Sequence, residues 1–451
     1  MEHQTTRATP MRRVATASCV GTTIEFYDFF IYGTAAALVF PQVFFPALGS
    51  AAGTVASFAT FAVAFVARPL GAILFGHYGD RLGRKNTLIA TLMLMGISTF
   101  VIGLLPGAAT LGIAAPIILV ALRFLQGLAV GGEWAGATLL AAEYAPPTKR
   151  GHYAIFPQLG SAIAFALASG TFLAVNYALG ETNPAFLDWG WRIPFLLSVV
   201  LVGVGLWVRL TIDETPAFRK AHERQSNAAA KGRPPILEVF RAQPREVLLA
   251  GGVLTIAFAL FYTGTTFLTN YGTSPTGVGL DRRTVLILNI TAAVVYGLTT
   301  AASGIRSDRF GRRKVIVTCC ALTIPWALVL FPLMSTGSVT TFALGLIGTL
   351  AIFGIAYGPI GAYLPEMFQT RYRYTGAGMG YNLGGILGGA IAPLLATELV
   401  GRYGTYAVGI MIAVLGLLSL ICVIALGETK NRAIDAEPAT TTNPVEGLSP
   451  A

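Results

Sequence analysis

The chain reads GHYGDRLGRK at residues 76–85 and GIRSDRFGRR at residues 304–313. The matched glycines, aspartate and arginines are all displaced by the same 228 residues, and each copy joins two long apolar stretches. Repeats of a membrane-spanning unit are typical of secondary transporters, whose halves rock around a central site. The sequence therefore predicts two copies of one membrane-spanning bundle.

A second internal repeat supports this duplication. The sequence EYAPPTKRG at residues 143–151 follows one apolar stretch, and EMFQTRYRYTG at residues 366–376 follows another. The two glutamates are 223 residues apart, which is close to the offset of the first repeat.

Composition indicates a membrane protein. Hydrophobic residues make up 54% of the chain, charged residues make up 12%, and 52 glycines are spread through apolar sequence. Soluble domains do not have this composition. About 20 apolar residues cross a bilayer. We therefore predict an all-α integral membrane protein with twelve transmembrane helices in two pseudo-symmetric six-helix bundles, near residues 14–40, 54–75, 86–106, 112–141, 153–179, 192–210, 246–270, 284–303, 315–335, 339–363, 374–398 and 404–426.

The basic residues predict the orientation. If the N-terminus is cytoplasmic, the tails and inner loops carry 25 of the 31 Lys and Arg residues. This asymmetry follows the positive-inside rule, so we expect a multi-pass protein of the cell membrane with both termini in the cytoplasm. It also explains the net charge of +10 without a nucleic-acid partner. The remaining basic residues are Arg192, Arg282, Arg283 and Arg402 on the outer side and Arg68 and Arg123 within spans.

The domain organisation follows from the apolar runs. We expect a cytoplasmic N-terminal tail at 1–13, a six-helix bundle at 14–210 and a charged cytoplasmic linker at 211–245. A second six-helix bundle follows at 246–427. The Thr-, Pro- and Ala-rich segment 428–451 is predicted to be a disordered cytoplasmic tail.

The chain lacks the motifs of ATP-driven transporters and of metal-dependent enzymes. No Gly-Lys dipeptide occurs, so the chain carries no Walker A loop, and no HExxH motif is present. The four cysteines lie in apolar spans without metal-ligand spacing. We expect no cofactor, no bound metal and no enzymatic activity. A channel or receptor fits less well, because a twofold build serves alternating access rather than a continuous pore.

Two carboxylates share one face of the first predicted helix. Glu25 and Asp28 are three residues apart, and Gly21 and Tyr32 continue the same stripe. Carboxylates at bilayer depth are costly and mark ion or substrate paths by default. The alternative is a buried ion pair that only fixes helix packing.

Arg123 provides a partner for these acids. Asp28 and Arg123 both fall near the predicted midplane at about 1.5 Å of rise per residue. If Asp28 and Arg123 pair in one conformation and separate in the other, the proton affinity of Asp28 differs between the two. Protonation of Asp28 would then favour one conformation. Glu133 lies about 15 Å nearer the cytoplasm, as a second proton stop or a gate. We therefore predict proton coupling by Glu25, Asp28, Arg123 and Glu133.

Polar and amphipathic residues within the spans are candidates to line a substrate cavity. For any one of them, hydrogen bonding between helices or interface anchoring is an equally good interpretation. Arg68 either extends to the lipid headgroups or pairs with an inward carboxylate. The predicted substrate-binding residues are Tyr27, Tyr32, Arg123, Gln126, Trp134, Gln158, Tyr262, Asn270, Tyr357, Tyr381 and Asn382.

The repeated loops, together with RFLQG at 123–127, resemble the major facilitator superfamily. Within it, EFYDFFIYG at 25–33, RPLG at 68–71, GGEW at 131–134 and PE at 365–366 resemble the metabolite:proton symporter group. That group includes shikimate, dicarboxylate, citrate and proline/betaine carriers. The resemblance covers residues 12–427. One departure is Phe26, where the group usually has Trp, so the wall of the pocket is expected to differ.

The resemblance implies roles that the residues alone do not. Residues matching Asp28 and Arg123 take part in proton coupling in related carriers. The loop charges are implied to form a conformational latch between the halves, whereas their plain interpretation is orientation charge and helix capping. The residues of this predicted latch are Gly76, Asp80, Arg81, Gly83, Arg84, Glu143, Arg150, Asp308, Arg309, Arg312 and Glu366.

Together these features predict a proton-coupled symporter that imports a small organic acid such as shikimate or a dicarboxylate. The alternative is a proline/betaine-type symporter. The C-terminal tail lacks the heptads of a coiled coil, and this absence argues against that alternative. The expected partners are a small-molecule substrate, protons and the lipid bilayer. We expect the protein to act as a monomer.

Overall fold

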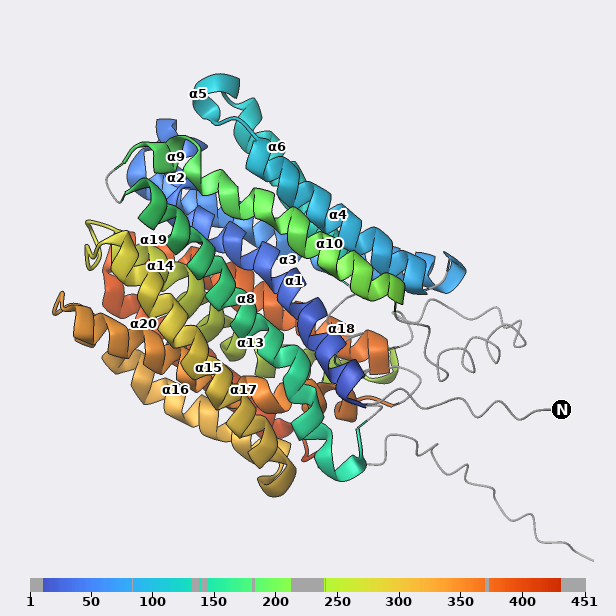
Figure 1. Cartoon of the computed structure of the whole chain (residues 1–451). Helices are drawn as coiled ribbons and strands as arrows, with labels where there is room; N and C mark the ends of the chain where they lie inside the picture. Colours follow the sequence, from blue (N-terminus) through green and yellow to red (C-terminus); the bar gives the residue numbers. More distant parts are fainter. Residues whose placement is uncertain are drawn as a thin grey trace, which may run out of the picture.

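The computed structural model describes residues 11–82, 84–131, 138, 145–180, 183–211, 239, 241–369 and 373–430. Over these ranges the chain is a bundle of long helices (Figure 1). The first half contains α1 (Met11–Leu38), α2 (Phe40–Val43), α3 (Gly49–Leu82), α4 (Arg84–Leu104), α5 (Ala108–Leu111), α6 (Ala114–Val130), α8 (Arg150–Leu179), α9 (Ala185–Asp188) and α10 (Ile193–Thr211).

The second half has the same plan with two interruptions. Its helices are α13 (Pro244–Tyr262), α14 (Leu268–Thr273), α15 (Arg282–Phe310), α16 (Arg312–Met334), α17 (Val339–Met367), α18 (Arg373–Gly384), α19 (Ala392–Tyr403) and α20 (Thr405–Ala425). The π-helical segment η4 (Thr263–Phe267) joins α13 to α14, and η5 (Gly385–Ile391) joins α18 to α19. π-helical turns often occur at functional sites.

The predicted all-α membrane fold is confirmed. Each of the twelve apolar runs contains at least one helix within the described residues, although the run 112–141 is described only up to 131 and at 138. Nine of these described helices are long and apolar enough to cross a membrane, and two shorter apolar helices, Ile89–Leu104 and Ala114–Val130, accompany them. The remaining run is α1, whose apolar residues flank Glu25 and Asp28.

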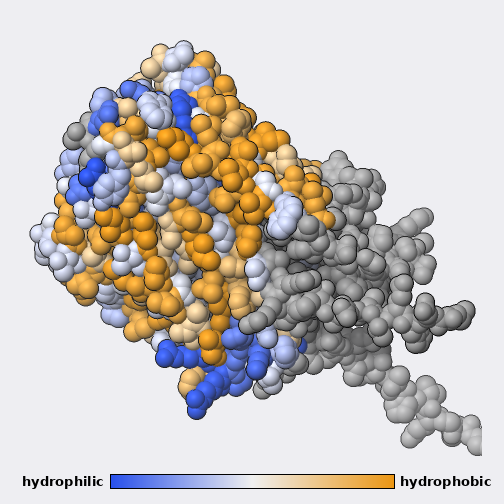
Figure 2. Space-filling view, viewed as in Figure 1, coloured by the Kyte–Doolittle hydropathy of each residue, from blue (hydrophilic) through white to orange (hydrophobic). Residues whose placement is uncertain are grey.

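The outer surface is apolar, as a bilayer requires. On α20 the exposed residues Ile410, Val414, Leu417 and Ile421 recur at helical spacing. Figure 2 shows hydrophobic residues across the middle of one face, with hydrophilic residues gathered toward its ends. The chain is therefore a multi-pass membrane protein.

Helices α3 and α6 pack unusually closely, and glycines make this possible. A Cβ atom at Gly71 would lie 2.0 Å from the Leu128 carbonyl oxygen, and one at Gly131 would lie 2.1 Å from the Arg68 carbonyl oxygen. These distances leave no space for any side chain, so only glycine fits. The backbone that carries Arg68 is therefore held directly against α6.

The halves contact each other at both ends of the bundle. We call the end with the start of α1 and the end of α20 the terminus side. At the opposite end, Asn270 Nδ2 donates to the Ala37 carbonyl at 2.8 Å, and Arg283 Nε donates to Asn176 Oδ1 at 3.1 Å. On the terminus side, Asp308 of α15 binds the first turn of α8.

Candidate functional site

A chain of side chains from three helices joins Asp28 to Arg123. Thr99 of α4 donates through Oγ1 to Asp28 Oδ2 at 2.9 Å, and it accepts from Gln126 Nε2 at 2.7 Å. Arg123 Nη1 in turn donates to Gln126 Oε1 at 3.1 Å. Asp28 is 2% exposed and Arg123 is 0% exposed. We call these four residues the relay.

Aromatic rings enclose the guanidinium of Arg123. Its central carbon lies 4.0 Å from the ring centre of Tyr32, 4.1 Å from that of Phe29 and 4.9 Å from that of Phe61. Contacts of this kind stabilise a cation that has lost its water. Tyr32 is held in place because its hydroxyl donates to Thr60 Oγ1 at 2.7 Å. In this conformation Arg123 is covered, so a substrate does not reach it.

A narrow cavity lies beside the relay, between the two halves. It is partly open, and its empty space of about 300 Å³ includes open solvent, so in this conformation it has room for little more than water. Glu25, which is 8% exposed, lies near the middle of α1. The described residues that line the cavity are Glu25, Phe26, Arg68, Val130, Gly131, Gly378, Tyr381 and Asn382.

Arg68 lies in the wall of this cavity and is 3% exposed. Its guanidinium carbon lies 4.5 Å from the ring centres of both Phe29 and Phe65. Of the two interpretations of Arg68, extension to the lipid headgroups does not fit this burial. The Phe29 ring contacts Arg68 and Arg123 alike, so it connects the cavity to the relay.

The second half supplies the opposite wall. Asn382 Nδ2 donates to the Gly131 carbonyl at 3.5 Å across the junction of the halves. Phe65 of α3 packs against η5, because Gly385 and Gly389 leave room for its ring. The π-helical turn thus receives an aromatic residue from the first half.

The predicted substrate-binding residues lie in several different surroundings. Tyr381 and Asn382 line the cavity. Tyr27, Gln158 and Asn270 instead make hydrogen bonds between helices, with Pro194 O, Tyr357 O and Ala37 O respectively. Tyr262 and Tyr357 are buried within the aromatic core. Trp134 and the predicted proton-coupling residue Glu133 lie outside the described residues.

Sequence reasoning missed parts of this site. Thr99 bonds to both Asp28 and Gln126, yet a threonine within an apolar run carries no distinguishing signal. The cage residues Phe29 and Phe61 are equally inconspicuous, because the chain contains 27 phenylalanines and many of them face lipid or core.

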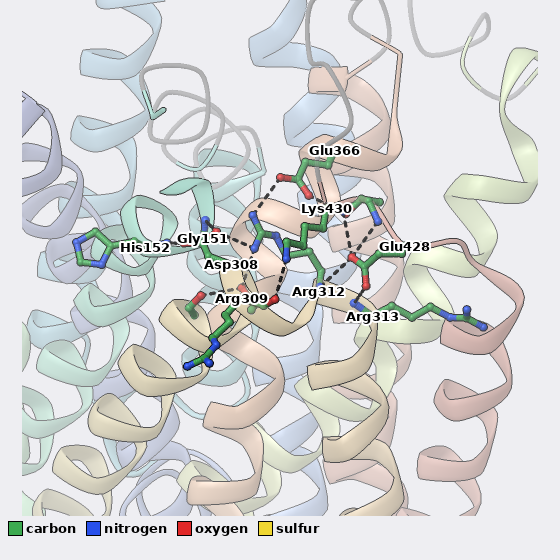
Figure 3. Close-up of polar contacts among 12 residues, drawn as sticks. Gly151, His152, Asp308, Arg309, Arg312, Arg313, Glu366, Glu428 and Lys430 are labelled. Carbon is green, nitrogen blue, oxygen red and sulfur yellow. Dashed lines mark hydrogen bonds and ion pairs between the residues drawn. The ribbon is translucent and has the colours of Figure 1, made fainter. Parts of the chain in front are cut away.

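A charged cluster joins the halves on the terminus side (Figure 3). Asp308 accepts from the backbone amides of Gly151 at 2.9 Å and His152 at 2.8 Å. A carboxylate is favourable at a helix N-terminus, where backbone amides lack partners. Arg312 Nη1 pairs with Asp308 at 2.7 Å, and Nη2 lies 3.5 Å from Glu366 Oε1. Asp308, Arg312 and Glu366 of the predicted latch therefore lie together, and Asp308 reaches the first half; their latch role stays a prediction.

Residues that follow α20 complete this cluster. Glu428 accepts from the backbone amides of Arg312 at 2.9 Å and Arg313 at 3.1 Å, at the start of α16. Thr429 donates to Glu366 at 2.7 Å, and the Lys430 ammonium donates to the Arg309 carbonyl at 2.7 Å (Figure 3). Residues 428–430 therefore make defined contacts, although we expected the disordered tail to begin at 428.

The first copy of the repeated loop is described only in part. Gly76, Asp80 and Arg81 belong to α3, and Arg84 begins α4. Their side chains, together with Gly83 and Glu143, lie outside what the structure describes. Arg150 begins α8 and is buried. The latch role of these residues stays a prediction.

Comparison with known proteins gives consistent matches. Residues 14–234 match the family Sugar (and other) transporter, and residues 258–449 match the Major Facilitator Superfamily. The chain is 45% identical to the inner membrane metabolite transport protein YhjE of Escherichia coli K12, over 96% of this chain and 98% of that protein.

Two other relatives have named substrates. The shikimate transporter of Escherichia coli K12 is 39% identical, over 86% of this chain and 88% of that protein. The proline/betaine transporter of Salmonella typhimurium is 32% identical, over 98% of this chain and 86% of that protein. The fold also resembles that of a D-xylose-proton symporter, with a TM-score of 0.71 and 17% identity over 94% of this chain and all of the other.

Proposed function

Because the chain belongs to the major facilitator superfamily of membrane transporters, we propose that it is a proton-coupled symporter that imports a small organic acid by alternating access. The family membership accounts for transport, and the homologues are named transporters rather than enzymes. The proton coupling and the substrate are the parts that we propose here.

The observation that carries proton coupling is the relay. Asp28 is a carboxylate at mid-depth in a membrane helix, where an isolated charge is costly. The Thr99 hydroxyl donates to its oxygen, and Gln126 connects that hydroxyl to the Arg123 cation. Rearrangement of α4 or α6 against α1 would break this support and make protonation of Asp28 favourable. Protonation then biases the equilibrium between two conformations, as coupled transport requires.

Glu25 is proposed as the proton-exchanging group that faces the substrate. It lies three residues before Asp28 on α1 and lines the cavity. A proton that enters the cavity therefore meets Glu25 before it reaches the relay. Glu133 keeps its proposed role as a second proton stop, although it lies outside the described residues.

Alternating access requires contacts that form and break at the two ends of the bundle. Asp308 and the first turn of α8 supply such a contact on the terminus side, and Asn270 with Ala37 supplies one at the opposite end. We propose that the Asp308 cluster opens when substrate is released. We propose that the terminus side faces the cytoplasm, and the excess of basic residues in the tails and inner loops supports this orientation.

Identity levels support an organic acid as the substrate. The shikimate transporter is 39% identical, whereas the proline/betaine transporter is 32% identical. The buried guanidinium of Arg68 in the cavity wall also suits a carboxylate ligand. A compatible-solute symporter remains the second candidate, because the proline/betaine match extends over 98% of this chain.

Uptake into proteoliposomes tests the proposal. Purified full-length protein, with a proton gradient acidic outside, should accumulate radiolabelled shikimate above its external concentration. A protonophore should abolish accumulation while leaving exchange of labelled for unlabelled substrate intact. Accumulation that survives the protonophore would contradict proton coupling, and accumulation of betaine but not of any organic acid would favour the second candidate.

A further inference from the structure

Arg68 and Arg123 differ in what can reach them. Both guanidiniums contact the Phe29 ring, but the remaining neighbours of Arg123 include Tyr32 and Phe61, which close its cage. Arg68 instead forms part of the cavity wall. Of these two buried arginines, Arg68 is the one that lines the cavity, so it is the one that a substrate entering from there would meet.

From this difference we propose that Arg68 is the residue that binds the substrate carboxylate, and that the cavity takes a small hydroxylated monocarboxylate rather than a dicarboxylate. This inference rests on the proposed function and names the substrate class of the same site. It assigns Arg123 to the relay alone.

The position of Arg68 suits a carboxylate anchor. Its backbone is fixed against α6 by Gly131, and its guanidinium is stacked on Phe29 and Phe65. Within the described part of the chain, Nε of this 3%-exposed residue has no hydrogen-bond partner. A buried donor without an acceptor is costly, and a ligand oxygen would remove that cost. A stacked, preorientated guanidinium also loses little entropy when it binds a carboxylate.

The charges around the cavity favour a single negative charge on the ligand. Glu25 and Arg68 are the acid and the base among the described residues that line it. When Glu25 carries a proton, Arg68 leaves one positive charge, which one carboxylate neutralises. Among the described residues that line the cavity, no other cation is left for a second carboxylate, since Arg123 is covered.

Polar groups of the second half favour a hydroxylated ligand. Tyr381 and Asn382 line the wall that faces Arg68. The amide of Asn382 makes only a long bond of 3.5 Å to Gly131 O, so a ligand hydroxyl can replace that contact without a large penalty. Contacts of one ligand with both halves would also draw the halves together.

Ligand-induced thermal stabilisation of the purified full-length protein tests the inference. A ligand that binds the folded protein raises its melting temperature, and the rise grows with its affinity. The probes are shikimate as a hydroxylated monocarboxylate, succinate as a dicarboxylate and glycine betaine as a zwitterion. The variants are R68Q, R68K and the control R402Q, which removes an exposed arginine paired with Glu398.

We expect shikimate to raise the melting temperatures of the wild type and of R402Q equally. Succinate added together with shikimate should displace little of it from the wild type. R68Q should bind shikimate about tenfold more weakly or worse, because a hydrogen bond to a charged group is stronger than one between neutral groups. R68K should be intermediate, since it retains the charge but not the stacked fork. The Arg68 assignment is wrong if both R68Q and R68K retain wild-type affinity.

Two outcomes separate this inference from the function on which it rests. If succinate binds more tightly than shikimate to the wild type, the monocarboxylate assignment is overturned without reference to any variant. If the wild type accumulates no organic acid in proteoliposomes, the proposed function itself fails. If the wild type takes up shikimate and R68Q binds shikimate as tightly as the wild type, the proposed function stands and only the role of Arg68 is wrong. If R68Q does not fold, the affinity of R68K for shikimate still tests the role of Arg68. Competition between succinate and shikimate on the wild type still tests the monocarboxylate assignment.

Discussion

Arg123 is joined to Asp28 through two intervening side chains, Gln126 and Thr99, by hydrogen bonds of 3.1, 2.7 and 2.9 Å. The path crosses α6, α4 and α1, so a movement of any of these helices against another changes the surroundings of the carboxylate. This arrangement explains how a change of conformation can alter the proton affinity of a residue that itself stays buried.

Replacing Asp28 by asparagine should separate coupling from transport. The asparagine side chain keeps the shape of the aspartate and an oxygen for the Thr99 hydroxyl, but it cannot bind a proton. We expect D28N to lose proton-driven accumulation and to retain substrate exchange, both measured in proteoliposomes. Glu398→Gln, which changes an exposed carboxylate paired with Arg402, is the control and should behave as the wild type. Full accumulation by D28N would refute the role of Asp28.

Thr99 tests whether the relay itself matters. Thr99→Val keeps the branched shape but removes the hydroxyl that bonds to both Asp28 and Gln126. Loss of these bonds leaves buried polar groups unsatisfied, at a cost of about 1–3 kcal/mol. We expect accumulation to fall about tenfold, and Thr99→Ser to restore most of it. Equal accumulation by the valine and serine variants would argue against the relay.

Arg123→Ala should lose both accumulation and exchange. The substitution removes the cation from its aromatic cage, and it frees the Phe29 ring that also supports Arg68. The measurement is uptake and exchange of labelled substrate, with size-exclusion chromatography to confirm that the variant is folded. An unchanged transport rate would contradict the role of Arg123 in the relay.

Asp308→Ala should loosen the terminus side. The carboxylate accepts from two backbone amides of α8 and pairs with Arg312, so its loss removes a contact between the halves. Spin labels on the exposed residues Lys149 and Lys314 would report the separation of α8 and α16. We expect a longer and broader distance distribution in the variant.

The matched control for that experiment is Asp281→Ala. Asp281 caps the opposite end of α15 by accepting from the Thr284 amide at 2.6 Å, so its substitution removes a helix-capping carboxylate without affecting the terminus side. The label distances in this control should equal those of the wild type. A wild-type distribution in Asp308→Ala would contradict the proposed role of the Asp308 cluster.

Gly127→Ala should destabilise the first half. A Cβ atom at this position would lie 2.4 Å from the Ala64 carbonyl oxygen, so α3 and α6 would have to separate. Overpacking of this kind typically costs about 1–3 kcal/mol. The control is Gly203→Ala, because a Cβ atom there meets nothing within 4 Å. Thermal unfolding in detergent should show a lower melting temperature for Gly127→Ala alone.

The sequence was sufficient for the fold because hydrophobicity alone marks the spans, and the repeated loops reveal the duplication. It also singled out Asp28, Arg123 and Glu25 as candidates, since charges in apolar runs are conspicuous, and their roles stay predictions. The π-helical turns were not predicted; at η5, the packing of Phe65 against Gly385 and Gly389 is a contact between halves that the sequence does not show. The contacts of Asp308 with Gly151 and His152 were not predicted either, because backbone amides occur at every residue and a sequence does not show which of them a carboxylate will bind. Arg68 was left between two interpretations until its ring contacts were known.

Simultaneous recording of substrate entry and internal pH in proteoliposomes tests the central claim most directly. Vesicles that contain the purified protein and a trapped pH-sensitive dye receive external shikimate without an imposed gradient. The account predicts acidification of the interior together with shikimate entry in the wild type, and none in D28N. Shikimate entry into wild-type vesicles at constant internal pH would contradict it.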